Sequence, residues 1–498
     1  MPRPRTHPHP RVLSRVRRTL GGLDYIQWVD FLEEVQVHLY RGRELWADIV
    51  LYDEEVPLAV IEAEGRVEEL EQGFQEARTK AIMLNPVDPV PYIWVAAGSE
   101  DKLYRANPTA HGIGVAYEPL DQGPEELLAL EQLSRDLGDY LGRRSSVEQA
   151  GQIGFRVVLE QAHKSLSRRD NPHIRCRKLL KWLRYIALGT TRPRGRRPRA
   201  LVNLLEQASS MIASSNLPAR ANFAFAFRHL MRRCFKPLTS NRNDPVRRFG
   251  RWMTPIGVIR FLVEAVDPQP EERVLDFACG SGGFLGQATR HLLERYNTAP
   301  DEFSQNLYGC DWDETCAETT KTFLTFMLPE RQTQLNIDKA DGLRHFEDNI
   351  SEFDVILSNP PAGDLPQDFA GLEDIESYQF AGRGRGRQAL YEVAFLERAL
   401  QMVKEGGRIG LVVPEGLLAN ATLKKLRYWW FDQVTVEAIV GLPRGTFPFT
   451  PSKMCAVVMR KESPPPNYET LLAEVSERHR LSEELRGILN RLKRSRSS

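Results

Sequence analysis

The spacing of apolar and polar residues divides the chain into stretches with different expected folds. In residues 20–120 it predicts a helix at 26–40, strands at 46–52, 57–63 and 91–97, and a charged helix at 68–84. Residues 123–249 show mostly helical spacing, interrupted at 190–200 by TTRPRGRRPRA, a Pro/Gly/Arg stretch that predicts a loop. The first half is therefore expected to fold as a small α/β unit followed by helices.

From residue 251 onward, strand-like runs alternate with helical ones. These runs are RVLDFA, NLYGCDWD, FDVILSNPP, GGRIGLVVPEG, VEAIVGLP and MCAVVMRK. Such alternation is typical of a doubly wound, Rossmann-like α/β sheet. Three prolines at 464–466 are expected to end that domain, before a charged amphipathic helix. The expected domains are a basic N-terminal arm (1–19), a small α/β domain (20–122), a helical domain (123–250), a Rossmann-like domain (251–462) and a helical tail (463–498).

Composition and charge exclude several classes of protein. The 498 residues include 67 basic and 66 acidic side chains, a net charge of +1 that excludes a uniformly basic DNA coat but permits a local phosphate-binding face. No apolar run approaches the roughly 20 residues that span a bilayer, so no membrane association is expected. The basic N-terminus is broken by prolines and lacks the apolar core of a signal peptide. Six cysteines without a C-x-x-C pair argue against a zinc site and favour a reducing cytoplasm.

The segment RVLDFACGSGGFLGQA, residues 273–288, predicts a cofactor pocket. Asp276 ends a strand, and Gly280, Gly282 and Gly283 form a turn that lets the backbone approach a ligand closely. In the next strand, LYGCDWD, either Asp311 or Asp313 is placed to accept hydrogen bonds from a ribose diol. Asp341, in ADGL at a third strand end, suits an adenine amino group.

The fourth strand, FDVILSNPPAG, predicts the reaction. It ends in Asn359, Pro360 and Pro361, where the prolines restrict the backbone and remove donors. The Asn359 side-chain carbonyl and the Pro360 backbone carbonyl can accept both protons of one exocyclic NH2 group. This frees the nitrogen lone pair for in-line attack on a sulfonium methyl, with catalysis by positioning and carbonyl dipoles. The chemistry alone serves the amino group of either adenine or cytosine.

Five segments in order resemble the modification subunit of type I restriction systems, which are γ-class N6-adenine DNA methyltransferases. They are MTPIGVIRFLVEAVDP, VLDFACGSGGFL, SNPPAG, YEVAFLERALQMVKEGGRIGLVVPEGLLA and VEAIVGLPRGTFPFTPSKMCAVVMRK. The resemblance implies an S-adenosylmethionine cofactor and a flipped-out adenine. It implies the following contacts: Thr254 and Pro255 flank the methionine moiety, Asp276, Gly280 and Gly282 line the cofactor, Asp311 meets the ribose, Asp341 meets the adenine ring, and Asn359, Pro360 and Pro361 meet the target base. The helices of residues 123–249 take the place of that family's helical N-terminal domain.

Two positions depart from that family. Its fourth motif ends in an aromatic residue that stacks on the flipped base, and here the position is Ala362. Such stacking is worth roughly 1–3 kcal/mol, so its loss would weaken base capture about ten- to a hundredfold unless Phe369 or Tyr378 substitutes. The aromatic residue before Thr254 is replaced by Met253, with Trp252 adjacent. An impaired enzyme that only binds S-adenosylmethionine and DNA, as a sensor or assembly protein, is the alternative.

The segment RELWADIVLYDEEVPLAVIEAEGR, residues 43–66, resembles the N-terminal nuclease fold of type I restriction subunits, of the P-D-(D/E)-x-K class. The resemblance implies that Asp48 and Glu62 hold Mg²⁺. The catalytic lysine position is Glu64, which cannot neutralise phosphate, although Lys80 on the following helix could reach back, and Gln75 matches a glutamine of that family. We expect a degenerate nuclease module. An active nuclease, giving a bifunctional enzyme, and a packing domain are the alternatives.

Arginine-rich segments and the tail indicate partners. Arg383, Arg385 and Arg387, after the Asn-Pro-Pro turn, are expected to contact phosphates of double-stranded DNA, whereas the loop at 190–200 is equally well a solvated linker. The tail has apolar residues at helical spacing and is expected to pack on another helix. Because no target-recognition domain is evident, we expect a separate specificity subunit, with a restriction or helicase subunit as a further candidate partner, within a restriction-modification or phage-defence system.

Overall fold

The computed structural model describes residues 9–22, 30–40, 43–53, 56–84, 90–106, 116–121, 123–124, 155, 158–159, 161–163, 165–166, 172–193, 199–231, 253–328, 335–346, 348–363, 378–380, 390–447 and 452–496. The chain divides into two compact units, Met1–Val157 and Val158–Ser498. Within the described part of the chain, no helix combines the length and apolar character needed to cross a membrane.

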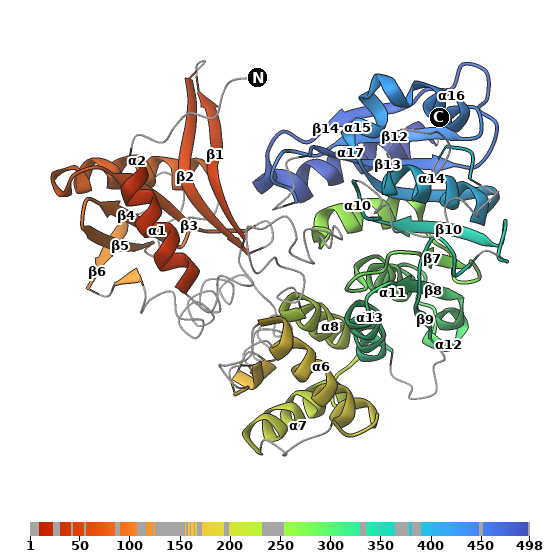
Figure 1. The fold of residues 1–498 in the computed structure, drawn as a ribbon, viewed down its shortest axis with the longest axis horizontal. Coiled ribbons are helices and arrows are strands. Elements are labelled where there is room, and N and C mark those ends of the chain that lie inside the picture. Colours follow the sequence, from red (N-terminus) through yellow and green to blue (C-terminus); the bar gives the residue numbers. More distant parts are fainter. Residues whose placement is uncertain are drawn as a thin grey trace. The chain divides into compact units, whose positions relative to one another are not determined.

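The first unit is built on a six-stranded sheet in the order β1-β2-β3-β4-β5-β6, flanked by helices (Figure 1). Its elements are α1 (Pro10–Gly22), β1 (Asp30–Tyr40), β2 (Arg43–Asp53), β3 (Val56–Glu64), η2 (Val67–Glu69), α2 (Leu70–Leu84), β4 (Tyr92–Ala97), β5 (Glu100–Ala106) and β6 (Tyr117–Leu120). Val16 and Leu20 of α1 pack with Ile61 on one face of the sheet. Ala77 and Ala81 of α2 pack with Val60 on the other. The alternation of β3 side chains thus feeds two separate cores.

Two expectations for this unit were wrong. Residues 30–40, expected to be helical, form β1, which pairs antiparallel with β2 from Asp30↔Tyr52 to Tyr40↔Arg43. The run Val35, Val37 and Leu39 has the period of two that a strand requires, and long-range pairing overrides the helical spacing. The expected N-terminal arm contains α1, whose apolar face belongs to the core of this unit.

Ahead of the large sheet, the described part of the second unit includes the helices α6 (Pro172–Leu188), α7 (Arg199–Ala213) and α8 (Leu217–Met231). The aromatic rings of α8 pack on α13 (Glu314–Met327): Phe225 lies 5.1 Å from Phe323 and Phe227 lies 5.2 Å from Phe326, each in an edge-to-face arrangement. These helices therefore share a core with the sheet domain and belong to the same compact unit.

An eight-stranded sheet in the order β14-β12-β13-β11-β10-β7-β8-β9 forms the centre of the second unit. Its strands are β7 (Val274–Asp276), β8 (Leu307–Asp311), β9 (Asn336–Lys339), β10 (Phe353–Ser358), β11 (Val403–Pro414), β12 (Thr435–Gly441), β13 (Met454–Arg460) and β14 (Leu471–Glu474). Strands β11, β10, β7, β8 and β9 run parallel to one another, whereas β13 is antiparallel to β11 and β12. This is the mixed sheet of a doubly wound α/β domain, as the alternation of strand and helix patterns predicted.

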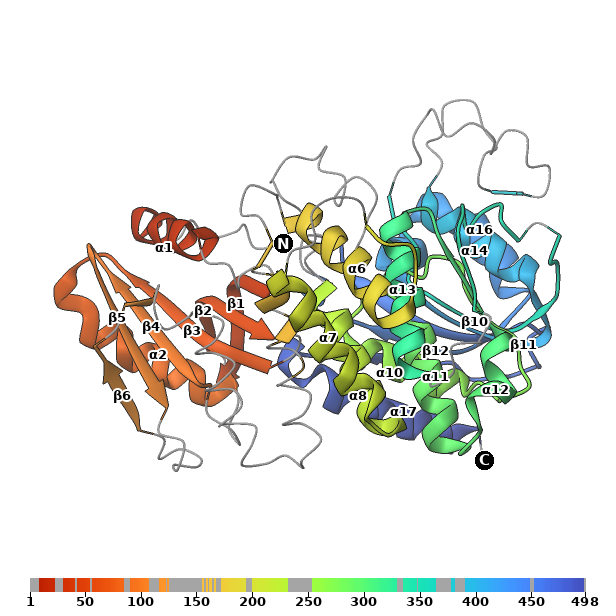
Figure 2. The same cartoon turned by 90° about the horizontal axis from the view of Figure 1, so that it is seen from below.

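Helices cover both faces of this sheet (Figure 2). The remaining helices are α10 (Ile256–Val266), α11 (Gly283–Arg295), α12 (Pro300–Phe303), η5 (Ser304–Asn306), α14 (Tyr391–Met402), α15 (Glu415–Ala419), η6 (Ala421–Leu423), α16 (Lys424–Phe431), η7 (Arg478–Arg480) and α17 (Leu481–Ser495). Phe395 of α14 and Trp430 of α16 share an apolar cluster with Leu411. Gly410, the residue before Leu411 in β11, faces Leu262 and Val266 of α10 on the opposite side of the sheet.

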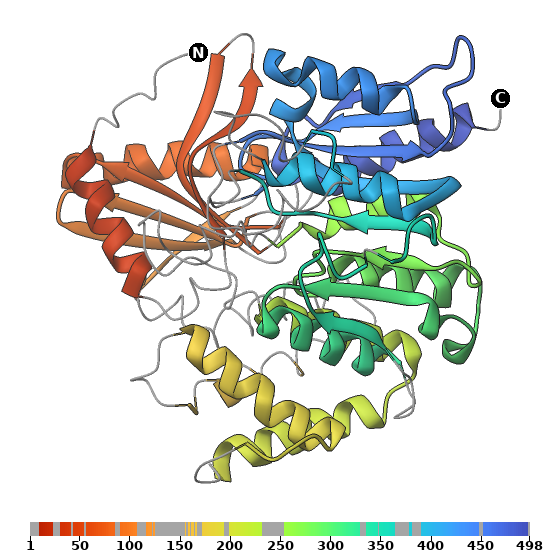
Figure 3. The same ribbon diagram turned by 45° about the vertical axis from the view of Figure 1, so that its right-hand side comes forward.

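The C-terminal segment does not form a separate tail. Strand β14 extends the sheet by pairing in parallel with β12, so the three prolines do not end the domain. Helix α17 buries Leu485, Ile488 and Leu492 and packs against α10, on the sheet face that α10 covers. Figure 3 shows this C-terminal segment, in dark blue, beside the large sheet. The apolar spacing therefore correctly predicted helix packing, but the partner is the chain's own α10.

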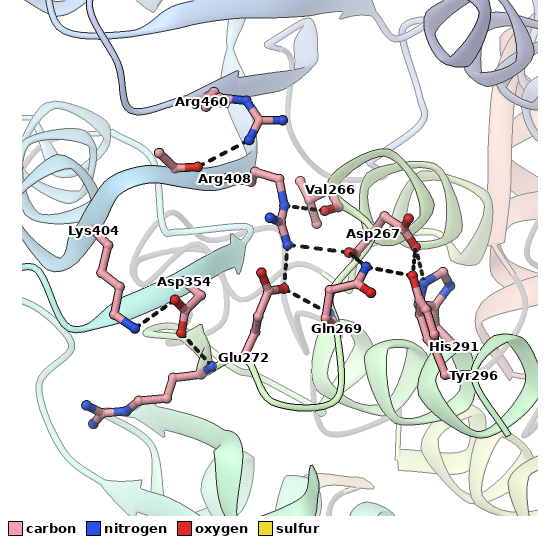
Figure 4. A network of polar contacts seen from close by, with 12 residues as sticks. Val266, Asp267, Gln269, Glu272, His291, Tyr296, Asp354, Lys404, Arg408 and Arg460 are labelled. Atoms are coloured by element: carbon pink, nitrogen blue, oxygen red, sulfur yellow. Dashed lines mark hydrogen bonds and ion pairs between the residues drawn. The ribbon is translucent and has the colours of Figure 1, made fainter. Parts of the chain in front are cut away.

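A polar network lies near the amino end of β7, the end away from the glycine turn (Figure 4). Asp267, which ends α10 at φ 48°, accepts hydrogen bonds from His291 Nε2 at 2.8 Å and from the Tyr296 hydroxyl at 2.9 Å. Burial alone would raise the pKa of Asp267, but these hydrogen bonds and Arg295 lower it to about 2. Arg408 of β11 donates to the Val266 carbonyl at 2.6 Å and pairs with Glu272. These contacts hold the segment between α10 and β7, and so the register of both.

Candidate cofactor and base-binding site

The glycine turn and the Asn-Pro-Pro turn lie side by side at the carboxyl edge of the sheet. Strands β7 and β10 are parallel neighbours, with Leu275 opposite Ile356. At the strand ends the Ser358 hydroxyl donates to Asp276 Oδ1 at 2.7 Å. The two turns that follow these residues therefore leave adjacent strands in the same direction, as ligand sites of open α/β sheets require.

The glycine turn has the backbone shape that a nucleotide cofactor needs. Gly280 and Gly282 have φ values of 53° and 81°. A Cβ on Gly282 would lie 2.9 Å from the Phe323 ring, whereas a Cβ on Gly280 would meet nothing closer than 3.9 Å. Gly282 thus allows close packing inward on α13, and Gly280 leaves space on its outer side. The Gly280 N–H donates to Asp311 Oδ2 at 2.9 Å, which ties the turn to the end of β8.

Asp276 lies beneath the turn, with only 1% of its surface exposed. Besides Ser358, the Ala278 N–H donates to its Oδ1, at 3.2 Å. Burial raises the pKa of Asp276 to about 7, and the nearby Asp311 adds to the rise, while the two hydrogen bonds oppose it. Asp276 therefore joins β7 to β10 beneath the glycine turn, and its expected place in the lining of the cofactor site stays a prediction.

The second and third strand ends carry the other acidic candidates. Asp313 accepts from the Cys316 N–H at 3.1 Å and caps α13, and Asp311 accepts from the Asp313 N–H at 2.8 Å as well as from Gly280, so both carboxylates are held at the end of β8. Asp341 accepts from the Leu343 N–H at 3.0 Å, which fixes its carboxylate after β9. Between Asp311 and Asp313, the indole of Trp312 is 61% exposed. Sequence reasoning missed this ring, although an exposed tryptophan beside an expected ribose ligand is a signal for stacking on an adenine.

Asn359 is held in one orientation by a residue far away in the sequence. Its Nδ2 donates to Thr254 Oγ1 at 3.0 Å, and Thr254 is buried just before α10, with Pro255 as the N-cap residue. No described residue donates to Asn359 Oδ1, and the side chain is half-exposed. Within the described residues, the amide oxygen is therefore an acceptor without a donor, at the end of the strand next to the one that leads into the glycine turn.

The segment after Pro361 is anchored to α14. The Gly363 N–H donates to Glu392 Oε2 at 2.8 Å, and the Gly363 carbonyl accepts from the Tyr391 N–H at 2.9 Å. Ala362 is partly exposed, and a Cβ on Gly363 would meet none of the described residues within 4 Å. Where the resembling family has an aromatic ring, the chain therefore offers only the methyl group of Ala362.

Tyr378 does not supply the aromatic ring that is missing at Ala362. It is 2% exposed, its hydroxyl donates to the Leu343 carbonyl at 3.1 Å, and Arg398 Nε donates to the same hydroxyl at 2.9 Å. Burial raises its pKa above the usual range. The suggestion that Tyr378 replaces the missing ring was wrong, because the residue is part of the core. Phe369, Trp252, Arg383, Arg385 and Arg387 lie outside the described residues.

Cys279, in the glycine turn, is 4% exposed. Burial raises the pKa of its thiol well above the usual value, and the neighbouring carboxylates of Asp311 and Asp276 act in the same direction. It is therefore a neutral, poorly reactive thiol in the folded chain.

In the first unit, the structure brings together Asp48, Glu62 and Lys80. Lys80 Nζ lies 2.5 Å from Glu62 Oε2, so the lysine does reach back from α2. Asp48 Oδ2 accepts from the Ala63 N–H at 2.7 Å. Glu62 Oε1 is buried and has no hydrogen-bond partner among the described residues, and burial raises the pKa of Glu62 to about 8.

Two further residues of this unit were singled out from the sequence. Burial and the nearby Glu76 and Glu69 raise the pKa of Glu64 to about 7. Gln75 donates to Glu71 along the exposed side of α2, at 2.8 Å, so it does not join the carboxylate group.

The family of this chain follows from its match to a protein-family model. The model of the N-6 DNA methylase family matches residues 237–495, slightly more than half of the 498 residues. The chain belongs to the N-6 DNA methylase family. The match includes both turns of the site and also β14 and α17, which agrees with their place in the sheet domain.

Relatives of this chain include the methylase subunits of type I restriction enzymes. The EcoEI subunit from Escherichia coli is 29% identical over 222 residues, which is 43% of this chain and 43% of the relative. The MjaVII subunit from Methanocaldococcus jannaschii is 24% identical over 222 residues, 43% of this chain and 37% of the relative. The chain spans less than half the length of these curated relatives.

Among solved structures, the chain resembles a class I S-adenosylmethionine-dependent methyltransferase from Listeria monocytogenes. The TM-score is 0.51 at 17% identity, covering 69% of this chain and 98% of the other. The likeness shows that this chain has the class I methyltransferase fold.

Proposed function

We propose that this chain is an S-adenosylmethionine-dependent DNA methyltransferase that modifies the N6 amino group of adenine. The observation that carries the proposal is the fixed amide of Asn359, bound to Thr254 and adjacent to the glycine turn after Asp276. Membership of the N-6 DNA methylase family supports adenine over cytosine. The glycine turn, with space outside Gly280, fits the cofactor, and Asp311, Trp312 and Asp341 would hold its nucleoside.

The residues of the site act by positioning. S-adenosylmethionine would supply the methyl group as a sulfonium. Asn359 Oδ1 and the Pro360 carbonyl accept the two amino protons of a flipped-out base and hold the nitrogen lone pair in line with the methyl group. Since Thr254 fixes the other end of the amide, the acceptor does not need to reorganise during the reaction.

The test is methyl transfer from labelled S-adenosylmethionine to mixed-sequence DNA, with identification of the methylated base by mass spectrometry. Wild-type protein should form N6-methyladenine, and Asn359→Ala should reduce transfer to background while S-adenosylmethionine still binds. Asn490→Ala, on the exposed side of α17, is the matched control and should keep full transfer. Lack of S-adenosylmethionine binding by the wild type would refute the proposal.

Ala362, which has no ring to stack on a base, favours a second candidate function, in which the chain binds S-adenosylmethionine and DNA but captures the base poorly. Such a protein would act as a sensor or assembly component. A clear thermal shift with S-adenosylmethionine, together with methyl transfer at the level of Asn359→Ala, would identify this function.

Double-stranded DNA and protein partners are part of the proposal. Arg383, Arg385 and Arg387 would contact phosphates near the extruded base, and a separate specificity subunit would supply sequence recognition. Because the apolar face of α17 is packed on α10, that subunit would bind elsewhere on the chain. Replacing the three arginines by alanine should weaken DNA binding and reduce its salt dependence.

For the first unit we propose a Mg²⁺ site of nuclease type at Asp48 and Glu62. The buried, unpartnered Oε1 of Glu62 and the half-buried Asp48 fit a cation, and Lys80 supplies the positive charge that Glu64 lacks. Burial keeps the pKa of Glu62 at about 8, so a cation must displace a proton at neutral pH. Nicking of plasmid DNA with Mg²⁺ that is lost in Asp48→Ala would indicate an active nuclease. Intact plasmid, with weak Mg²⁺ binding that also needs Asp48, would indicate the degenerate module.

A further inference from the structure

A buried arginine of the helical segment lies at the cofactor end of the sheet domain. Arg228, on α8, is only 3% exposed, and its Nη2 donates to the Thr254 carbonyl at 3.3 Å. Thr254 is the residue whose hydroxyl holds Asn359. Nothing in the local sequence of α8 distinguishes Arg228 from the other arginines of the chain, so only the fold identifies it.

The guanidinium of Arg228 also packs against the start of α11. A Cβ on Gly283, the first residue of α11, would lie 2.7 Å from Arg228 Nη2 and 3.0 Å from its Cζ. Only a glycine therefore permits this approach. The side chain thus touches both boundaries of the region where the methionine moiety is expected, Thr254 on one side and the glycine turn on the other.

The charge at this point favours an anion. The N–H groups of the first turn of α11 form the positive end of the helix dipole. That turn contains no acidic residue that would offset this charge. The guanidinium adds a full positive charge to the same place. S-adenosylmethionine carries two cationic groups, the sulfonium and the amine, and one anionic group, the carboxylate. The carboxylate is therefore the part of that cofactor that this environment stabilises.

The arginine is also held rigidly. Helix α8 is fixed to α13 by the ring pairs Phe225–Phe323 and Phe227–Phe326. The Arg228 side chain itself is buried and bound to the Thr254 carbonyl, so it loses little conformational entropy when it binds a ligand, which increases the net gain from each hydrogen bond.

We propose that Arg228 binds the carboxylate of the methionine moiety of S-adenosylmethionine, so that the helical segment completes the cofactor pocket. The assignment rests on the proposed function, because it takes S-adenosylmethionine as the cofactor. It gives the helices before the sheet domain a direct role in the site, beyond packing on α13.

The test compares S-adenosylmethionine with decarboxylated S-adenosylmethionine, which keeps the sulfonium and the amine but lacks the carboxylate. Dissociation constants are measured by titration calorimetry on the full chain. Wild-type protein should bind S-adenosylmethionine about tenfold more tightly or better, as expected for a charge-assisted hydrogen bond. Arg228→Met should lose that preference, because its affinity for S-adenosylmethionine falls while its affinity for the decarboxylated compound stays the same. Arg228→Lys should keep part of the preference.

Arg290→Met is the matched control. Arg290 lies on α11 beside the Phe225 ring and pairs with Glu294, so its replacement removes a cation from the helix that Arg228 contacts without changing Arg228, Thr254 or Gly283. It should retain the wild-type preference.

Each outcome decides the assignment. Equal loss of affinity for both compounds in Arg228→Met would show that the arginine only positions Thr254, and would overturn it. Equal affinity of both compounds for the wild type would overturn it without any variant, even where Arg228→Met fails to fold. Binding of neither compound by the wild type would instead refute the proposed function itself.

Discussion

Replacing Asp276 by asparagine should remove a specific pH dependence of stability. The folded pKa of Asp276 is about 7, against an ordinary value of 3.8, chiefly because the carboxyl is buried. Because the pKa is raised in the folded state, the contribution of Asp276 to the free energy of unfolding is fully present below pH 3.8. This contribution is lost as the pH rises through about 7. Between pH 5.5 and 8 the linkage relation gives a loss of about 2 kcal/mol for the wild type. Asparagine keeps an acceptor for Ser358 and Ala278 but does not ionise.

The assay is calorimetric melting of the full chain at pH 5.5 and pH 8. A difference of about 2 kcal/mol corresponds to roughly 4–8 °C for a domain of this size. The melting point of the sheet domain should therefore fall relative to Asp276→Asn as pH rises. Asp301→Asn, at an exposed carboxylate of α12, should keep the wild-type slope. The reasoning is refuted if Asp276→Asn and the wild type change in parallel between the two pH values.

Three other substitutions test the site. Thr254→Val leaves Asn359 without its hydroxyl partner and should reduce methyl transfer about 5- to 100-fold. The affinity for S-adenosylmethionine should change less than about threefold. An equal loss of affinity for S-adenosylmethionine would contradict the positioning role of Thr254. Ala362→Tyr restores a ring at this position and should raise kcat/KM on DNA by up to about a hundredfold. No gain in a steady-state assay would mean that the base is stacked by another residue. Trp312→Ala should weaken S-adenosylmethionine binding about 5- to 100-fold by calorimetry, whereas Tyr428→Ala, equally exposed on α16, should not; similar affinities would exclude stacking on the indole.

The parts of the fold that sequence could predict are those set by adjacent residues. The glycine turn and the Asn-Pro-Pro turn each lie within a few residues of a strand, so spacing predicted them and the structure places them side by side. The β14–α17 segment was misjudged because its pairing with β12 and its packing on α10 join residues far apart in sequence. Strand β1 was read as a helix for the same reason, since its partner β2 decides its conformation.

The same distinction holds within the candidate site. The residue types and their order predicted Asn359 and Asp311, whereas the contact that orients Asn359 comes from Thr254, more than a hundred positions earlier. Tyr378 was offered as a base-stacking ring because aromatic residues near a motif cannot be sorted into buried and exposed from sequence. Its bonds to Leu343 and Arg398 place it in the core. Arg228 has no sequence signature at all, because its role depends on how α8 crosses the start of α11.

The buried thiol of Cys279 can report how often the backbone of the glycine turn opens. A neutral thiol enclosed by the fold reacts with iodoacetamide only when the surrounding backbone transiently separates, so its alkylation rate counts those events. A compound that occupies the pocket closes this route and should slow alkylation in proportion to its occupancy. Peptide mapping after timed labelling would thus measure ligand binding and the local cooperativity of the turn in one experiment, with no engineered probe.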